Sequence, residues 1–154
     1  MSLNVSQRAA LELERRKRRK RMTPDYRSSL RILNKNLQLV PFKPNAVQQD
    51  YAQKRTQRNL ILKARQLGFS TSIQAEHFAE AITHTTLSAT LAHDDATTQK
   101  LRRMADRFWS NLDNPPKRGL ANATTTTYPD TQSEVTIATA GSGNVGRGGT
   151  YNRV

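Results

Sequence analysis

The segment Asn59–Thr71 constrains the fold of this chain more than any other stretch. Its apolar run Leu60–Leu62 is typical of a short buried strand of a parallel sheet. The polar, glycine-containing stretch Lys63–Phe69 then predicts a loop, and Ser70 begins a segment with helical spacing. A strand, a loop and a helix with a hydroxyl group at its start form the layout of a phosphate-binding loop. The segment therefore predicts an α/β protein.

The loop departs from the usual phosphate-binding motif, G-x-x-x-x-G-K-[ST]. Gly68 and Ser70 occupy the second glycine and the hydroxyl position, but Lys63 replaces the first glycine and Phe69 replaces the lysine. Gly68 would still permit a sharp turn, the following amides would face an anion, and Ser70 could ligate Mg²⁺. The phosphate-binding cation would then come from Lys63 or Arg65. An ordinary turn between a strand and a helix, with two basic residues in it, is the alternative.

The segment Lys63–Thr71 closely resembles the deviant Walker A segment of the large subunit of tailed-phage terminases, the DNA-packaging motors. That segment carries Arg-Gln-x-Gly-x-Ser/Thr, and its lysine is often displaced to the start of the loop. Upstream, Pro41–Gln48 resembles the family's adenine-reading segment, in which a glutamine recognises the base. The resemblance extends from Pro41 to Val154. Two motifs in the right order and close together are more specific than either one.

The resemblance implies an ATP and Mg²⁺ site. Gln48 would read adenine, Lys63 and Arg65 would contact phosphates, and Ser70 would ligate the metal. The implied nucleotide-binding residues are Gln48, Lys63, Arg65, Gln66, Gly68, Phe69, Ser70 and Thr71. In the family the complete enzyme hydrolyses ATP to drive double-stranded DNA into a procapsid, and it also carries a nuclease domain. The implied partners are double-stranded DNA, the terminase small subunit and the portal protein, in an oligomeric motor in the host cytoplasm.

One element of such an ATPase is missing from the sequence. Phosphoryl transfer in this class needs an apolar strand ending in Asp-Glu, which holds Mg²⁺ and orients the attacking water. No part of 41–154 provides it, so we assign no catalytic residue and expect nucleotide binding without hydrolysis. We therefore expect a partial P-loop NTPase domain over residues 41–154, a parallel sheet with crossover helices. A basic, helical N-terminal extension would precede it over residues 1–40.

Composition favours a polyanionic partner. The 154 residues suffice for one domain, and 25 Lys and Arg against 12 Asp and Glu give a net charge of +13 and a pI of about 10.9. Seven of the basic residues are consecutive, at Arg15–Arg21. Without cysteine the chain forms no disulfides, and it has neither an apolar run long enough to span a membrane nor a signal peptide. These features predict a soluble, intracellular protein.

The order of the expected elements follows from caps and periodicity. We expect helices over 6–22, from Thr23 through Leu30, Leu33 and Leu37, from the cap Asn45 to about Gln57, over 70–83, and over 96–112 after the cap His93–Asp95. We expect strands at Leu60–Leu62, Thr86–Ala92, Thr124–Tyr128 and Glu134–Thr139. The expected inward residues of the last two helices are Ile73, Ala75, Phe78, Ala79, Ile82, Leu101, Met104, Phe108 and Leu112, with Trp109 at the edge of the core.

Two other functions fit part of the sequence. A helicase-type ATPase also has a glutamine motif before its phosphate loop, but it keeps a lysine where this chain has Phe69. A non-enzymatic basic protein would instead bind nucleic acid through Arg15–Arg21 and its basic body. The pattern G-x-G-x-x-G at Gly141–Gly146 lacks a following helix, and the three histidines lack the spacing of a metal site.

Overall fold

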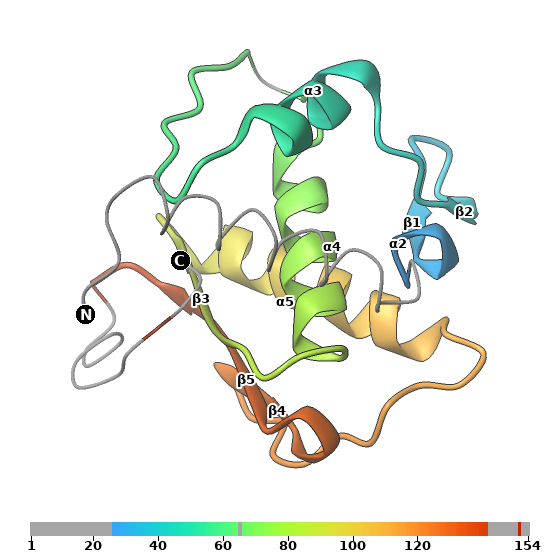
Figure 1. Ribbon diagram of the computed structural model, residues 1–154, viewed down its shortest axis with the longest axis vertical. Coiled ribbons are helices and arrows are strands. Elements are labelled where there is room, and N and C mark those ends of the chain that lie inside the picture. The colour runs from blue at the N-terminus through green and yellow to red at the C-terminus, as the bar shows by residue number, and fades with distance from the viewer. Residues whose placement is uncertain (1–25, 65, 142–150, 152–154) are drawn as a thin grey trace, which may run out of the picture.

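A three-stranded sheet organises the protein, which is represented by a computed structural model that describes residues 26–64, 66–141 and 151 (Figure 1). Its strands are β3 (Leu87–Ala92), β4 (Thr125–Tyr128) and β5 (Ser133–Thr139). Their order is β3-β5-β4, in which β3 runs parallel to β5 and β4 runs antiparallel to it. The parallel pair confirms an α/β fold. That the fold is a P-loop NTPase stays a prediction.

The threonine-rich part of the chain forms the hairpin that its sequence predicts. Thr125 pairs with Thr136 and Tyr128 pairs with Ser133, and a short 3-10 helix, η1 (Pro129–Thr131), joins the two strands. The β-branched threonines fit a pleated surface, and Pro129 ends β4 because it cannot donate to the ladder. The hairpin therefore adds β4 to the free edge of β5.

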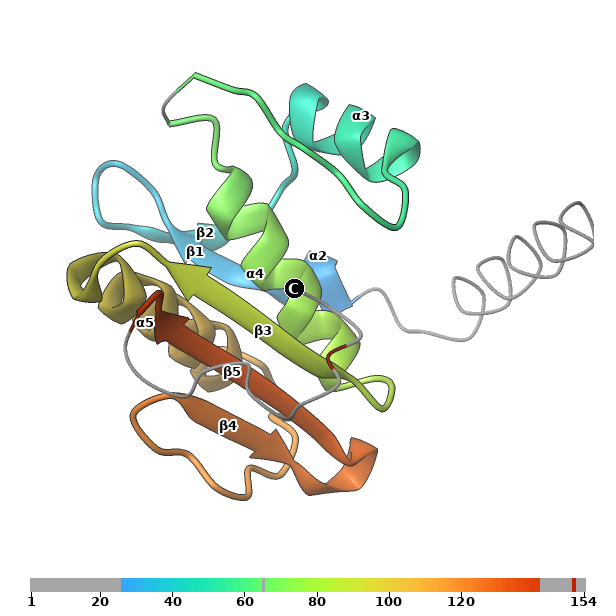
Figure 2. The same cartoon turned by 90° about the vertical axis from the view of Figure 1, so that its left-hand side faces the viewer.

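Two helices cover one face of this sheet (Figure 2). They are α4 (Phe69–Ala81) and α5 (Asp95–Ser110), and α5 forms the crossover between β3 and the hairpin. Asp94 caps α5, since its carboxylate accepts the backbone N–H of Thr97 at 2.6 Å. That hydrogen bond lowers the pKa of the Asp94 carboxyl below its ordinary value. The capping predicted for His93–Asp95 is confirmed at Asp94.

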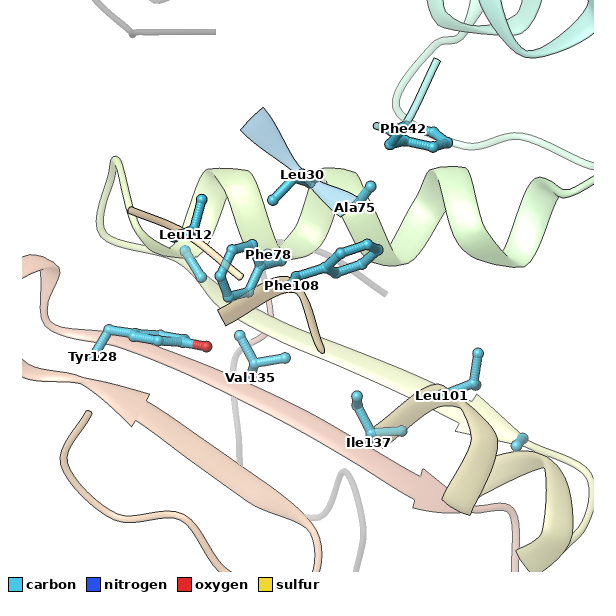
Figure 3. Packing of buried hydrophobic residues seen from close by; sticks show 12 residues of the cluster. Leu30, Phe42, Ala75, Phe78, Leu101, Phe108, Leu112, Tyr128, Val135 and Ile137 are labelled. Carbon is cyan, nitrogen blue, oxygen red and sulfur yellow. The ribbon is translucent and has the colours of Figure 1, made fainter. Parts of the chain in front are cut away.

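The hydrophobic core lies between these helices and the sheet (Figure 3). From the helices it takes most of the residues that helical spacing predicts, and Trp109 packs at its edge. The buried members of the predicted set are Ala75, Phe78, Leu101, Phe108 and Leu112, and the half-buried members are Ile73, Ala79, Ile82 and Met104. The rings of Phe78 and Phe108 lie 5.8 Å apart, and the hairpin contributes Tyr128, Val135 and Ile137. Burial of these side chains holds the layers together.

The helix predicted through Leu30, Leu33 and Leu37 is wrong. Of the residues that the structure describes in this stretch, only α2 (Tyr26–Ser29) is helical, and it leads into an antiparallel hairpin of β1 (Arg31–Leu33) and β2 (Leu39–Pro41). The reason is the turn at Asn34, whose side-chain oxygen accepts the backbone N–H groups of Asn36 and Gln38, each at 2.9 Å. Asparagine that binds its own backbone in this way favours a turn over a helix.

The β1–β2 hairpin belongs to the body of the fold. Leu30 is 0% exposed and lies in the same core cluster as Phe42, and the Phe42 backbone N–H donates to the Leu30 carbonyl at 2.7 Å. Residues 30–40 are therefore not helical. The helix predicted over 6–22 lies outside the described residues, and the boundary at residue 40 stays a prediction.

The strand predicted at Leu60–Leu62 is also wrong. Residues 59–64 have no regular secondary structure, and the side chains of Leu60 and Leu62 are 99% and 100% exposed. A strand needs a hydrogen-bonded neighbour. In the part of the chain that the structure describes, β3 has β5 as its one neighbour in the sheet, and no strand pairs with 60–62.

None of the described helices is both long enough and apolar enough to cross a membrane.

Candidate functional site

The candidate site is the junction at which residues 66–68 enter α4. Gly68 is the N-cap of this helix and has a left-handed backbone, with φ of 70°. No side chain caps the helix there, and the first bond inside it is from the Ser72 N–H to the Gly68 carbonyl at 3.0 Å. The amides of residues 69–71 precede that bond and have no partner within the helix. An anion at the N-terminal end of α4 would meet these N–H groups and the positive end of the helix dipole.

A second helix, α3 (Ala46–Lys54), holds the loop in place. The Gln48 side chain is 5% exposed, and its amide nitrogen donates to the carbonyls of Leu67 at 3.2 Å and Gly68 at 2.9 Å. Asn45 adds a donor bond to the Leu67 carbonyl at 3.3 Å. The two motifs on which the family resemblance rests are therefore in direct contact.

Gln48 also caps its own helix. Its side-chain oxygen accepts the Asn45 N–H at 3.0 Å, while Asn45 accepts the Gln48 N–H at 2.9 Å. This reciprocal pair is a capping box. The Gln48 amide group is thus bonded within the protein through both its nitrogen and its oxygen, and that leaves the oxygen's second lone pair for any further partner.

Glycine is favoured at residue 68 by its backbone conformation and by a close contact. A Cβ atom at residue 68 would lie 2.7 Å from the amide nitrogen of Gln48. The positive φ and this close approach both favour glycine, so the contact between α3 and the loop depends on it.

Phe69 turns inward instead of toward the helix end. It is buried, and its ring meets that of Tyr51 edge-on, with centroids 5.6 Å apart. Arg55, just after α3, makes an ion pair with the buried Glu76 of α4. These two contacts anchor α3 to α4 beside the loop. Of the residues predicted to bind nucleotide, Phe69 could contribute only its backbone N–H.

The remaining predicted residues that the structure describes are exposed or half-buried. Ser70 is exposed in the first turn of α4, and Thr71 beside it is half-buried. Lys63 and Gln66 are exposed, and Gln66 has a left-handed backbone with φ of 65°. Arg65 lies outside the described residues. The junction thus brings together Gln48, Gly68, Ser70 and Thr71, while Lys63 lies in the irregular segment that precedes the loop.

The junction lies at the end of the sheet where the parallel strands finish. Figures 1 and 2 both show α4 beginning on the side where β3 ends, with α3 above that start. Crevices at the carboxyl ends of parallel strands are where open α/β sheets bind ligands. The N-terminus of α4 therefore has the position of an anion site, and its first amides have no partner within the helix.

A polar network links α4 to β3 below the junction. Gln74 donates to the Thr90 hydroxyl at 2.8 Å, and that hydroxyl lies 3.3 Å from Nδ1 of His77. Gln74 and His77 are buried. Such bonds satisfy polar groups inside the layer and fix the rotation of α4 on the sheet.

The sequence also contains signals for the capping role of Gln48 and for the position of Tyr51, neither of which we predicted. Asn45 followed by glutamine three residues later is a capping-box signature, which predicts Gln48 as a capping residue. Tyr51 lies one turn after Gln48, on the same face of α3, and so beside the loop. No local signal predicts the Arg55–Glu76 ion pair, because its partners come from different elements.

Neither the protein-family models nor the curated proteins compared with this chain contain a match. Within 26–64, 66–141 and 151 no three His, Asp or Glu side chains are placed to hold a metal ion together. A Mg²⁺ ion bound with a nucleotide takes one or two protein oxygens and otherwise phosphates and waters. The exposed Ser70 hydroxyl in the first turn of α4 fits that smaller requirement.

Proposed function

We propose that this chain is the nucleotide-binding part of an ATP-driven DNA-packaging motor, similar to a terminase large subunit, and that it binds ATP with Mg²⁺ at the start of α4. The observation that carries the proposal is the direct contact between Gln48 and the Gly68 turn. Each of these two motifs resembles the terminase family separately. A turn of unrelated function would not require a contact between them.

The proposed roles follow from where each side chain lies. The amides of residues 69–71 receive the phosphates, the Ser70 hydroxyl ligates Mg²⁺, and Thr71 lies beside it. Lys63 supplies a cation from the preceding segment, together with Arg65. Bound Mg²⁺ would neutralise the phosphate charge that remains after Lys63 and Arg65 have made their contacts.

Gln48 acts chiefly as a positioning residue in this proposal. Both of its polar atoms already serve the loop and the cap of α3. Reading the adenine N6 and N7 edge would require its nitrogen to leave the Leu67 carbonyl, which Asn45 also contacts. Hydrolysis is not part of the proposal, because the Asp-Glu strand is missing from the sequence. Double-stranded DNA, a small subunit and a portal remain partners that the resemblance implies.

The experiment is equilibrium binding of a fluorescent, non-hydrolysable ATP analogue to the 154-residue chain, with Mg²⁺ and with EDTA. We expect Mg²⁺-dependent binding that Ser70→Ala and Lys63→Ala each weaken about tenfold or more, the scale of a lost hydrogen bond to a charged group. Ser110→Ala and Lys117→Ala are matched controls, since both residues are exposed and distant in sequence from the loop. A folded chain that binds no analogue, or binding unchanged in both test variants, would contradict the proposal.

A further inference from the structure

The helix α5 presents two chemically different faces. Leu101 and Phe108 are buried in the core, whereas Lys100, Arg103 and Arg107 lie on the opposite side, at the three- and four-residue steps that align side chains on a helix. Lys100 and Arg103 are exposed and Arg107 is half-buried. We call these three residues the basic stripe.

Asp106, the acidic residue between Arg103 and Arg107, does not cancel the charge of the basic stripe. Asp106 is bound by Arg118, with Nη1 and Oδ1 3.0 Å apart. At the start of the helix, Asp95 accepts the Thr139 hydroxyl and keeps its negative charge, and Lys100 acts on the Asp94 carboxylate through space. None of the ion pairs found among the described residues involves Lys100, Arg103 or Arg107. Three like charges held together on a rigid helix form a local positive field.

The β1–β2 hairpin beside α5 carries further positive charge. Strand β1 packs against α5, and Figures 1 and 2 both show the hairpin beside that helix. Arg31 in β1 and Lys35 in the turn are both exposed. Ile32 between them packs on the core, so its neighbour Arg31 points outward.

We propose that the basic stripe, with a contribution from Arg31 and Lys35 of the neighbouring hairpin, binds the phosphate backbone of double-stranded DNA. Seven residues of α-helix rise about 10 Å, and each DNA strand places one phosphate charge about every 3.4 Å along the axis. The stripe can therefore neutralise two or three phosphates at once. The choice of duplex DNA rests on the proposed function, whereas the choice of a polyanion rests on the charge alone.

The composition of the outward face favours a nucleic acid over an acidic protein. Besides the stripe it carries Ala96, Gln99, Ser110 and Asp106, which is paired with Arg118, and it has no large apolar or aromatic side chain. Protein interfaces depend on such anchors in their centre, whereas phosphate binding needs basic and polar groups only. Because no base edge is read, binding should be independent of sequence and should weaken with salt.

The test measures binding of the full chain to a fluorescent 25-base-pair duplex over a range of salt concentrations, without nucleotide. The test variant is Lys100→Ala, Arg103→Ala and Arg107→Ala together. The control removes the same charge from exposed residues elsewhere, at Lys43, Arg58 and Lys117. Circular dichroism of both variants checks that they fold, and both retain Arg15–Arg21.

We expect the test variant to bind about tenfold more weakly at low salt and to lower the slope of log K against log salt by about 2 to 3, as the loss of three phosphate contacts predicts. The control should change affinity less than threefold. Equal effects of the two variants, no duplex binding by the parent chain, or equally tight, stripe-dependent binding of polyglutamate would each overturn the proposal. Because nucleotide is absent, none of these results bears on the ATP site.

Discussion

The two halves of the segment Asn59–Thr71 behave differently, although the sequence predicts them as one unit. The C-terminal half forms a defined junction, in which Gly68 begins α4 and Gln48 binds the turn. The N-terminal half, Leu60–Leu62, has no regular secondary structure, pairs with no strand within the described residues, and is exposed at both leucines. The turn and the helix start predicted for the C-terminal half are therefore present, whereas the strand predicted for the N-terminal half is not.

The difference shows which interactions each half needs. A positive-φ glycine, a helix start and a capping box are formed by residues close together or in adjacent elements. A buried strand depends instead on neighbours on both sides. Leu60–Leu62 has an apolar sequence, but the described sheet ends at β3. An apolar run is thus necessary for a central strand without being sufficient for one.

The largest expected effect on stability comes from comparing the same leucine-to-alanine substitution at a buried and at an exposed position. Leu30→Ala should lower the free energy of unfolding by about 2 to 5 kcal/mol, because it leaves a cavity in the core. Leu62→Ala should change it by less than about 0.5 kcal/mol, because that side chain is fully exposed. Urea denaturation of both variants measures the difference. A loss of more than about 1 kcal/mol at Leu62 would show that the segment is buried in solution.

A smaller effect separates the two reasons for glycine at the junction. Gly68 and Gly141 both have positive φ, of 70° and 84°, but a Cβ atom at 141 would meet no atom of the described residues within 4 Å. Gly141→Ala should therefore cost about 1 kcal/mol from backbone strain alone. Gly68→Ala should cost about 1 kcal/mol more, because it also displaces the Gln48 amide, whose bonds hold the loop. Equal losses in the two variants, measured by urea denaturation, would mean that the Gln48 contact does not stabilise the loop.

The sequence predicts the layered part of the fold well because its signals are local and repeated. Each local signal predicts one helix or one hairpin. For α5 the signals are the cap Asp94 and the apolar spacing of Leu101 and Phe108, and for the hairpin the signal is its threonine-rich strands. The hairpin at 31–41 escapes prediction because Leu30, Leu33 and Leu37 match helical spacing by chance, while the turn depends on the single side chain of Asn34. Leucine spacing alone does not distinguish the two structures.

The sequence predicts where the residues of the candidate site lie better than it predicts what each side chain does. Gly68 and Ser70 lie where the motif places them, at the start of α4. Phe69 lies at the motif's lysine position but is buried against Tyr51, and Gln48 serves the loop and a cap. These roles depend on how α3 packs against α4, and no spacing along the chain encodes that packing.

The measurement that tests the central claim most directly is an amide NMR titration of the isotope-labelled 154-residue chain with Mg²⁺ and a non-hydrolysable ATP analogue. If α4 begins at a phosphate site, the largest shifts will be those of the amides of residues 68–71, and α5 residues such as Arg103 will stay unchanged. A saturating titration that leaves the amides of 68–71 unmoved, or moves chiefly those of another element, would contradict the account.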